Sequence, residues 1–237
     1  MTVRSFTTHK VGNKPEENED SFSYDEERGL FAIADGATEY PFSGEWSRSL
    51  TSMFLGTGCL ENSADFQEFV RKTRDVWRNK IDISGIPWFV RNKLSGGAYS
   101  TFLGLCIDYE AGEFKVIFVG DSCLFHLTDS GYEVFPPLTP SDFRNNPKLV
   151  WSGYGLPELR RVSAVRSSPS IMKRNWREGD SFILATDAFS KWIIEGPTEE
   201  KLTEIMENFE ALCSRIDEMR INHTIKNDDV TILVVTP

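Results

Sequence analysis

Three apolar segments of strand length in this chain each end at an aspartate. Asp35 follows FAIA, Asp121 follows FKVIFVG and Asp187 follows SFILAT. A continuous apolar run bounded by turn residues is typical of a buried strand, so each aspartate falls where such a strand meets solvent. The pair Asp35-Gly36 taken alone also fits an ordinary surface turn. The recurrence favours sheet structure that gathers carboxylates at one rim.

Two more acids, Glu19 and Asp20, stand just before a predicted strand over residues 21–24. The turn DEERG then leads into the strand that ends at Asp35, and this hairpin brings the two acids near Asp35. Because neighbouring residues on a strand point to opposite faces, at most one of the pair faces a given site. A solvated acidic loop, EENEDS, is the alternative interpretation of this stretch.

At the end of the chain, Asp228 and Asp229 precede an apolar strand. If this strand is the antiparallel neighbour of the one before Asp187, its acids lie at the same rim. Several carboxylates gathered there repel one another unless protons or a cation neutralise them, which favours a hard divalent metal. We expect Mg²⁺ or Mn²⁺ rather than zinc, because no His or Cys accompanies these acids.

The rest of the pattern combines strands with amphipathic helices and predicts a largely antiparallel sheet with helices over one face. The predicted strands cover residues 3–8, 21–24, 31–34, 113–119, 123–128, 181–186 and 230–235, and residues 96–110 are also predicted to be strand-rich. The predicted helices cover residues 43–55, 65–81 and 198–221.

Residues 136–161 contain five prolines and are predicted to form a long irregular, flap-like excursion, of a kind that is usually functional or mobile. Its arginines, Arg144, Arg160 and Arg161, either meet an anionic substrate or keep the loop soluble. No linker composition divides the chain, so residues 1–237 are predicted to form one domain.

The formal net charge is −10, from 36 acidic and 26 basic residues. This excess argues against a nucleic-acid footprint and disfavours anionic membranes. No window approaches the roughly 18 apolar residues of a membrane span, and the N-terminus lacks a signal-peptide core, so we expect a cytoplasmic protein. The four cysteines form no C-x-x-C pair and are expected to be free, buried thiols: Cys59, Cys106, Cys123 and Cys213.

Six short motifs span nearly the whole chain: NEDSF, FAIADG, GGAYSTFLGL, VIFVGDS, FILATDA and NDDVTILVV. In order and rough spacing they resemble those of the metal-dependent protein phosphatases, the PPM or type 2C class. The resemblance implies an α+β fold, a four-layer α-β-β-α sandwich of two antiparallel sheets flanked by helix pairs, with a metal site at one end of the sheets.

The same resemblance implies a role for each acid. Asp35 is similar to the carboxylate that bridges two metal ions, and Gly36 is similar to the residue whose carbonyl binds one of them. Asp187 and Asp228 resemble terminal ligands of the first ion, and Glu19 resembles the acidic ligand of the second ion, with Asp20 as its outer-shell neighbour. Asp121 resembles a ligand of a third, more weakly bound ion. Catalysis would then rest on Asp35, Asp187 and Asp228. The implied reaction is in-line attack on phosphorus by a water or hydroxide that bridges two Mn²⁺ or Mg²⁺ ions.

Three positions depart from the family pattern. Many members have an arginine four residues before the Glu19-type acid, where this chain has Pro15, with Lys14 beside it as a weaker, point-charge candidate for phosphate. The histidine that follows Asp-Gly in eukaryotic members is Ala37 here, and Ala188 replaces the usual glycine after the late aspartate. Leaving-group protonation therefore falls to water or to another side chain.

The sequence predicts a metal-dependent phosphatase that acts on phosphoserine or phosphothreonine in proteins. We expect a monomer with neither a nucleic-acid nor a membrane partner. The alternative is a phosphatase-like binding or regulatory module with little turnover, which Pro15 and Ala37 favour. A metal nuclease is disfavoured by the acidic surface.

Overall fold

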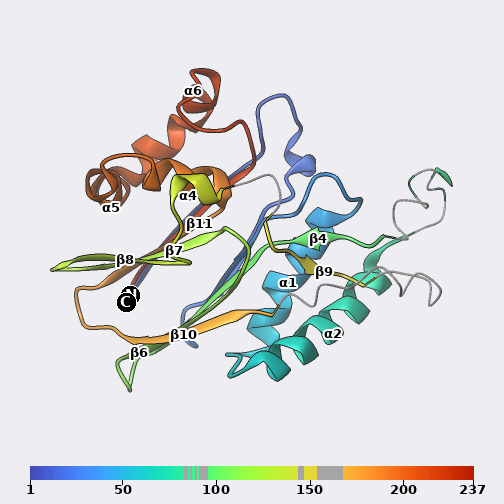
Figure 1. Ribbon diagram of the computed structural model, residues 1–237, viewed down its shortest axis with the longest axis horizontal. Coiled ribbons are helices and arrows are strands. Elements are labelled where there is room, and N and C mark those ends of the chain that lie inside the picture. Colours follow the sequence, from blue (N-terminus) through green and yellow to red (C-terminus); the bar gives the residue numbers. More distant parts are fainter. Residues whose placement is uncertain (83–84, 86, 89, 91–95, 144–146, 154–167) are drawn as a thin grey trace.

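Two five-stranded antiparallel sheets form the centre of the computed structural model, which describes residues 1–82, 85, 87–88, 90, 96–143, 147–153 and 168–237 (Figure 1). Sheet A contains, in spatial order, β1 (Thr2–Thr8), β12 (Val230–Thr236), β11 (Ser181–Ala185), β7 (Cys123–Thr128) and β8 (Gly131–Phe135). Sheet B contains β10 (Ser170–Asn175), β6 (Glu113–Val119), β5 (Phe102–Asp108), β3 (Leu30–Ala34) and β2 (Ser21–Asp25). A two-stranded ladder joins β4 (Tyr99–Ser100) to β9 (Val150–Trp151).

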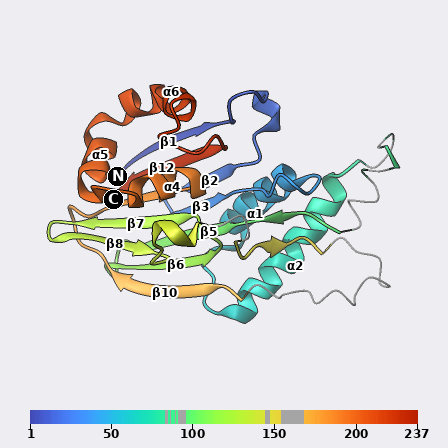
Figure 2. The same ribbon diagram turned by 45° about the horizontal axis from the view of Figure 1, so that its top comes forward.

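Helices cover the outer face of each sheet (Figure 2). On sheet B lie α1 (Ser43–Thr57) and α2 (Ser63–Lys80), and on sheet A lie α4 (Asp187–Ile194), α5 (Thr198–Ser214) and α6 (Ile216–Ile221). Two short 3₁₀ turns, η1 (Pro15–Glu17) and η2 (Pro140–Asp142), lie in the connections.

Apolar side chains fill three layers that follow from the period-two alternation of the strands. On β3, Phe31 and Ile33 point between the two sheets, whereas Leu30 and Ala32 point toward α1 and α2. On β11, Phe182 and Leu184 face sheet B, and Ile183 faces α4 and α5. The expected four-layer sandwich is therefore confirmed.

The predicted strands are found close to their predicted limits, except that residues 96–110 contain two strands, β4 and β5. The helices differ in detail. The second helix begins at Ser63 rather than Asp65, because Asn62 caps it by accepting the backbone N–H groups of Ala64 and Asp65. The third predicted helix is two helices, α5 and α6, which meet at Arg215. Sequence reasoning also missed α4, which begins at Asp187 itself.

The proline-rich segment is less irregular than expected where the structure describes it. Within residues 136–161 it contains η2 and β9, and Ser100 of β4 lies opposite Val150 of β9. The arginines singled out in this segment, Arg144, Arg160 and Arg161, lie outside the described residues.

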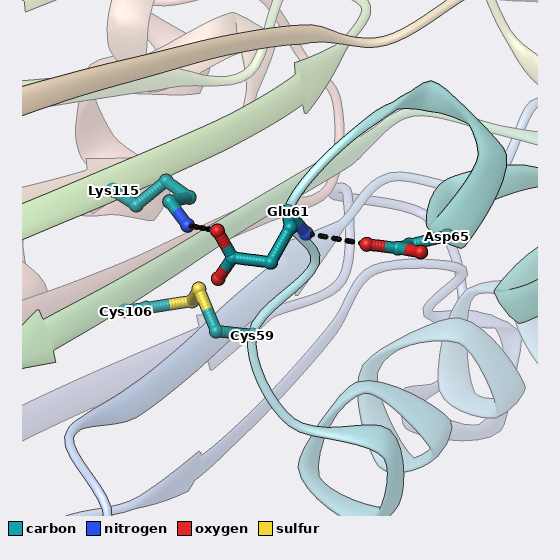
Figure 3. Close-up of a disulfide and its surroundings, with 5 residues drawn as sticks. All are labelled: Cys59, Glu61, Asp65, Cys106 and Lys115. Atoms are coloured by element: carbon teal, nitrogen blue, oxygen red, sulfur yellow. Dashed lines mark hydrogen bonds and ion pairs between the residues drawn. A yellow bond between two sulfur atoms is a disulfide. The ribbon is translucent and has the colours of Figure 1, made fainter.

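The expectation of four free thiols is wrong for one pair. Cys59, in the loop after α1, and Cys106, on β5, form a disulfide (Figure 3). Beside it Lys115 of β6 forms an ion pair with Glu61. The sequence gives no sign of this bond, because 47 residues separate the two cysteines and only the packing of the α1–α2 loop on sheet B brings them together. Cys123 and Cys213 are free and buried, as expected.

None of the described helices has both the length and the apolar character needed to cross a membrane.

Candidate metal centre

Antiparallel registers bring the predicted acids to one end of the two sheets. On the β2–β3 ladder Ser21 pairs with Ala34, so the next position along places Asp20 opposite Asp35. On the β7–β11 ladder Cys123 pairs with Ala185, so two positions further along Asp121 lies opposite Asp187. The acids therefore meet because each sits one or two residues beyond a paired strand end.

Asp228 reaches the same end from the neighbouring strand. Ala185 pairs with Ile232 on the β11–β12 ladder, and the backbone N–H of Thr186 donates to the carbonyl of Thr231 at 3.1 Å. Asp228 lies just before this paired stretch, as Asp187 lies just after it. The antiparallel neighbour expected from the sequence is thus present.

The carboxylates lie close enough to change one another's pKa. Burial raises the pKa of Asp35 well above its ordinary range, and repulsion from Asp20, Asp187, Asp228 and Asp121, in that order, raises it further. The largest of these charge effects comes from Asp20. Asp20, and not Glu19, is therefore the member of the acidic pair that faces Asp35.

Burial also governs the protonation of the other members. It raises the pKa of Asp121 to about 7, with a further contribution from Asp187. Burial and the charge of Asp229 raise the pKa of Asp20, although a hydrogen bond from Thr186 opposes the rise. Burial likewise raises the pKa of Asp187, against the attraction of Lys226. Without a divalent cation, burial and mutual repulsion therefore favour the protonated forms of Asp20, Asp35, Asp121 and Asp187.

Two carboxylate oxygens in this cluster are buried without a hydrogen-bond partner: Oδ1 of Asp20 and Oδ1 of Asp121. The two residues are 6% and 5% exposed, and the other oxygen of Asp20 accepts a hydrogen bond from the hydroxyl of Thr186 at 2.9 Å. A buried, unpaired carboxylate oxygen is costly unless a cation or proton meets it. The donor set, which is all oxygen, fits Mg²⁺ or Mn²⁺.

In the described part of the chain, no three Asp, Glu, His or Cys side chains stand close enough to hold one ion as they are. A lysine that sequence reasoning did not assign lies between two of the acids. The Nζ atom of Lys226 is 2.5 Å from Oδ2 of Asp228 and 3.5 Å from Oδ2 of Asp187. Burial opposes the charge on Lys226, but the two carboxylates outweigh it and raise its pKa.

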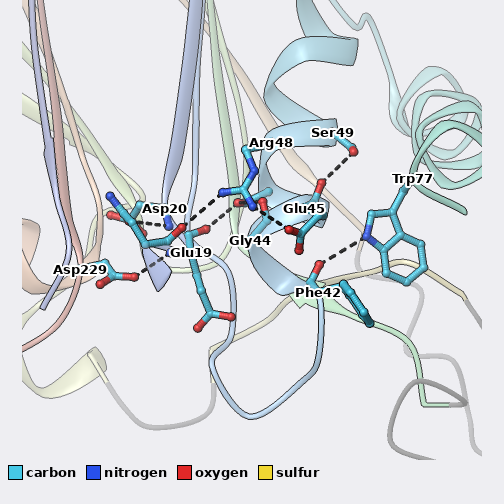
Figure 4. Close-up of polar contacts among 11 residues, drawn as sticks. Glu19, Asp20, Phe42, Gly44, Glu45, Arg48, Ser49, Trp77 and Asp229 are labelled. Carbon is cyan, nitrogen blue, oxygen red and sulfur yellow. Dashed lines mark hydrogen bonds and ion pairs between the residues drawn. The ribbon is translucent and has the colours of Figure 1, made fainter. Parts of the chain in front are cut away.

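Glu19 is held by its backbone beside the cluster (Figure 4). Its N–H donates to Oδ2 of Asp229 at 2.8 Å, and its carbonyl accepts the N–H of Gly36 at 3.2 Å and the hydroxyl of Ser47 at 2.5 Å. Burial raises the pKa of Glu19, while a hydrogen bond with Thr38 opposes this. The backbone of Glu19 thus links β3, α1 and the loop before β12.

Gly36 is required at its position by space. A Cβ atom there would lie 2.8 Å from the carbonyl carbon and oxygen of Ser43 and 2.9 Å from the carbonyl oxygen of Glu19. The turn after Asp35 therefore packs directly on the first residue of α1.

Lys14 is exposed, and its backbone N–H donates to the carboxylate of Glu17 at the start of η1. Lys10 lies closer to an acid of the set: its Nζ donates to Thr38 at 3.2 Å, and its charge acts on Glu19. Sequence reasoning missed Lys10, because nothing in THKVG distinguishes it from a surface lysine.

Arg220 on α6 was also missed. Its guanidinium is buried and donates to the carbonyl of Asp228 at 2.7 Å, to that of Thr8 at 3.2 Å and to the carboxylate of Asp217 at 2.7 Å. It therefore fixes the backbone of Asp228 against the end of β1.

The architecture is the fold of the PPM-type phosphatases. The serine/threonine phosphatase PstP/Ppp of Mycobacterium tuberculosis is 17% identical, with a TM-score of 0.64 over 98% of this chain and 97% of that one. PppA, described as a key regulatory component of T6SS in Pseudomonas aeruginosa, is 17% identical, with a TM-score of 0.64 over 99% and 97% of the two chains.

The catalytic domain of PstP in complex with two manganese ions is 16% identical, with a TM-score of 0.63 over 98% of this chain and 96% of that one. No protein-family model matches this sequence, and no curated protein matches it significantly. At these identities the likeness establishes the fold.

Proposed function

We propose that this protein is a metal-dependent phosphatase that hydrolyses phosphoserine or phosphothreonine in proteins. The observation that carries the proposal is a cluster of five aspartates at the end of a PPM-type fold. Asp20 and Asp121 are buried, each with one unpartnered carboxylate oxygen, and Asp35, Asp187 and Asp228 are half-buried beside them. The similar structures include serine/threonine phosphatases, one of them with two manganese ions.

Asp35, Asp187 and Asp228 are the proposed principal ligands, with Gly36 contributing its carbonyl and with Glu19, Asp20 and Asp121 as further oxygen donors. Two Mn²⁺ or Mg²⁺ ions bound there would activate a water and neutralise charge on the phosphoryl oxygens. The chain itself supplies orientation: Asp229 fixes the backbone of Glu19, and Arg220 fixes that of Asp228. Residues 1–237 would act as one monomeric, cytoplasmic domain.

The substrate's phosphate needs a local cation, because the surface as a whole carries a net charge of −10. Lys14 is the candidate by sequence position, and Lys10 is a candidate by contact, since it lies beside Thr38 and acts on Glu19. Either would hold phosphate as a point charge rather than by a bidentate fork.

The second candidate function is a phosphatase-like binding or regulatory module. Ala37 favours it, because its backbone N–H is bonded to the carbonyl of Tyr99 and its methyl side chain cannot protonate a leaving group. Pro15 favours it as well, since proline carries no charge for phosphate.

Hydrolysis of p-nitrophenyl phosphate and of a phosphothreonine peptide, with Mn²⁺ and with chelator, tests the proposal. We expect turnover that requires the metal and is lost in Asp35→Asn and Asp187→Asn. Asp129→Asn, in the exposed β7–β8 turn, is the matched control and should behave as the wild type. Manganese binding without turnover of any phosphosubstrate would favour the binding module. Turnover that persists in chelator would overturn the metal mechanism.

A further inference from the structure

The ammonium group of Lys226 contacts the carboxylate oxygen that is otherwise free on each of two proposed metal ligands, Asp187 and Asp228. Oδ1 of Asp187 already accepts the backbone N–H of Ala188 at 2.6 Å, and Oδ1 of Asp228 accepts that of Asp229 at 3.1 Å. The remaining oxygen of each carboxylate, Oδ2, is the one that Lys226 contacts. A single ammonium group thus joins the two carboxylates.

A divalent ion and this ammonium group cannot both lie between the same two Oδ2 atoms. Mg²⁺ and Mn²⁺ bind carboxylate oxygens at about 2.0–2.2 Å, which leaves no room for an ammonium between the same two atoms. Like charges also repel, so the approach of the metal disfavours Lys226 at this position. A metal ion that joins these two oxygens must therefore displace Lys226.

The structure provides space for the displaced side chain. A cavity of about 370 Å³ lies next to the cluster and is lined by Ala188, Lys191, Trp192, Glu195, His223 and Asn227, together with Lys226 itself. The side chain of Lys226 is 54% exposed, so rotation about its own bonds moves the ammonium from the two aspartates toward this cavity and solvent.

We infer that Lys226 is a tethered cation that takes the place of a metal ion between Asp187 and Asp228 and competes with it. This inference rests on the proposed metal centre. In the metal-free protein, Lys226 neutralises the repulsion of the two acids. In the presence of metal it weakens binding, because the ion must break two charge-assisted contacts before it reaches the oxygens.

Isothermal titration of metal-free protein with Mn²⁺ tests the inference directly, with the wild type, Lys226→Met and Lys191→Met. Lys191 lines the same cavity and pairs with Glu195, so its variant removes an equal charge without touching the acids. We expect Lys226→Met to bind Mn²⁺ at least about tenfold more tightly than the wild type, and Lys191→Met to bind it equally.

Thermal unfolding supplies a second measurement that does not depend on activity. In chelator, Lys226→Met should have a lower Tm than the wild type, because its acids lose their neutralising partner, and saturating Mn²⁺ should raise its Tm by more than it raises the wild-type value.

If the wild type binds Mn²⁺ and Lys226→Met binds it equally or more weakly, the role of Lys226 is overturned and the proposed metal centre is still supported. If Lys191→Met binds Mn²⁺ as tightly as Lys226→Met does, the gain in affinity comes from the loss of one positive charge in general, and the role of Lys226 is also overturned. Absence of Mn²⁺ binding in all three proteins would overturn the inference together with the proposed function.

Discussion

The Oδ2 atom of Asp229 accepts the backbone N–H of Glu19 at 2.8 Å. Its Oδ1 atom accepts the backbone N–H of Lys10, also at 2.8 Å. Asp229 is 5% exposed, so one buried carboxylate ties two loops that border the acidic cluster to the start of β12.

Replacement of Asp229 by alanine leaves these two N–H groups without a partner. We expect Asp229→Ala to weaken Mn²⁺ binding about ten- to hundredfold, because the groups that orient metal ligands control affinity. We also expect the free energy of unfolding to fall by about 1–3 kcal/mol. Calorimetric titration and urea denaturation measure the two effects. Asp129→Ala is the control, and equal Mn²⁺ affinity in both variants would contradict the role of Asp229.

Neutralisation of Asp35 should affect stability and activity in opposite directions. Asp35 is half-buried, and the charges of four other aspartates act on it, so Asp35→Asn removes this repulsion together with a partly desolvated charge. In chelator we expect the free energy of unfolding to rise, because the neutral amide is not repelled by the neighbouring carboxylates. Metal-dependent hydrolysis should be lost. A variant less stable than the wild type in chelator would show that the acids do not repel one another.

The metal-free protein should become less stable as the pH rises through neutrality. The pKa of Asp121 is raised to about 7 in the folded state, against about 3.9 for an unfolded aspartate, so the folded state binds more protons between these values. Stability is therefore greatest near the lower end of this window and falls as Asp121 ionises.

Urea denaturation at two pH values measures this dependence. From Asp121 alone we expect the protein in chelator to be about 1 kcal/mol more stable at pH 6 than at pH 8. Saturating Mn²⁺ should abolish or reverse the difference, because a bound cation favours the ionised carboxylates. Greater stability at pH 8 in chelator would contradict the raised pKa.

Gly36→Ala should disturb the site through the backbone. The added methyl would lie within 2.9 Å of backbone atoms of Ser43 and Glu19, which cannot move away independently. We expect a loss of about 1–3 kcal/mol in the free energy of unfolding and a reduced hydrolysis rate. Gly56→Ala, at a helical position with nothing within 4 Å, is the matched control and should be neutral or slightly stabilising. Equal effects of the two variants would refute the packing argument.

The Cys59–Cys106 disulfide should contribute to stability without affecting metal binding. It closes a loop of 47 residues, for which the expected contribution is about 2–4 kcal/mol. Cys106 pairs with Leu30, at the opposite end of β3 from Asp35. A Cys59→Ser/Cys106→Ser variant should therefore unfold at lower urea concentration but bind Mn²⁺ with wild-type affinity. A large loss of affinity in the folded variant would indicate that the bond also shapes the metal centre.

The strands and their acidic ends were predictable because both depend on local patterns. Sequence reasoning placed β6 at residues 113–119 and β7 at residues 123–128, as found, since apolar runs there are bounded by turn residues. The helix α4 was not predicted. It begins at Asp187, directly after a strand, and its eight residues are too few for a clear helical period.

The groups that hold the acids in place could not be found in this way. Arg220 and Asp229 act through backbone atoms of Asp228 and Glu19, and no side-chain motif records a contact with the backbone. Lys226 precedes Asp228 by two residues and reads as part of a solvated loop, KNDD. Its ammonium lies between two carboxylates only because β11 and β12 are neighbours.

The acidic ends of the strands come from both halves of the sandwich. Asp35 extends from sheet B, Asp187 and Asp228 extend from sheet A, and Asp121 lies in the turn that passes from one to the other. An ion held by this set would act as a cross-link between two layers whose shared interior consists mainly of apolar side chains. Sliding of one layer past the other by a fraction of an ångström would then be resisted by coordination bonds, so metal loading should slow hydrogen exchange deep inside both sheets rather than at the rim alone.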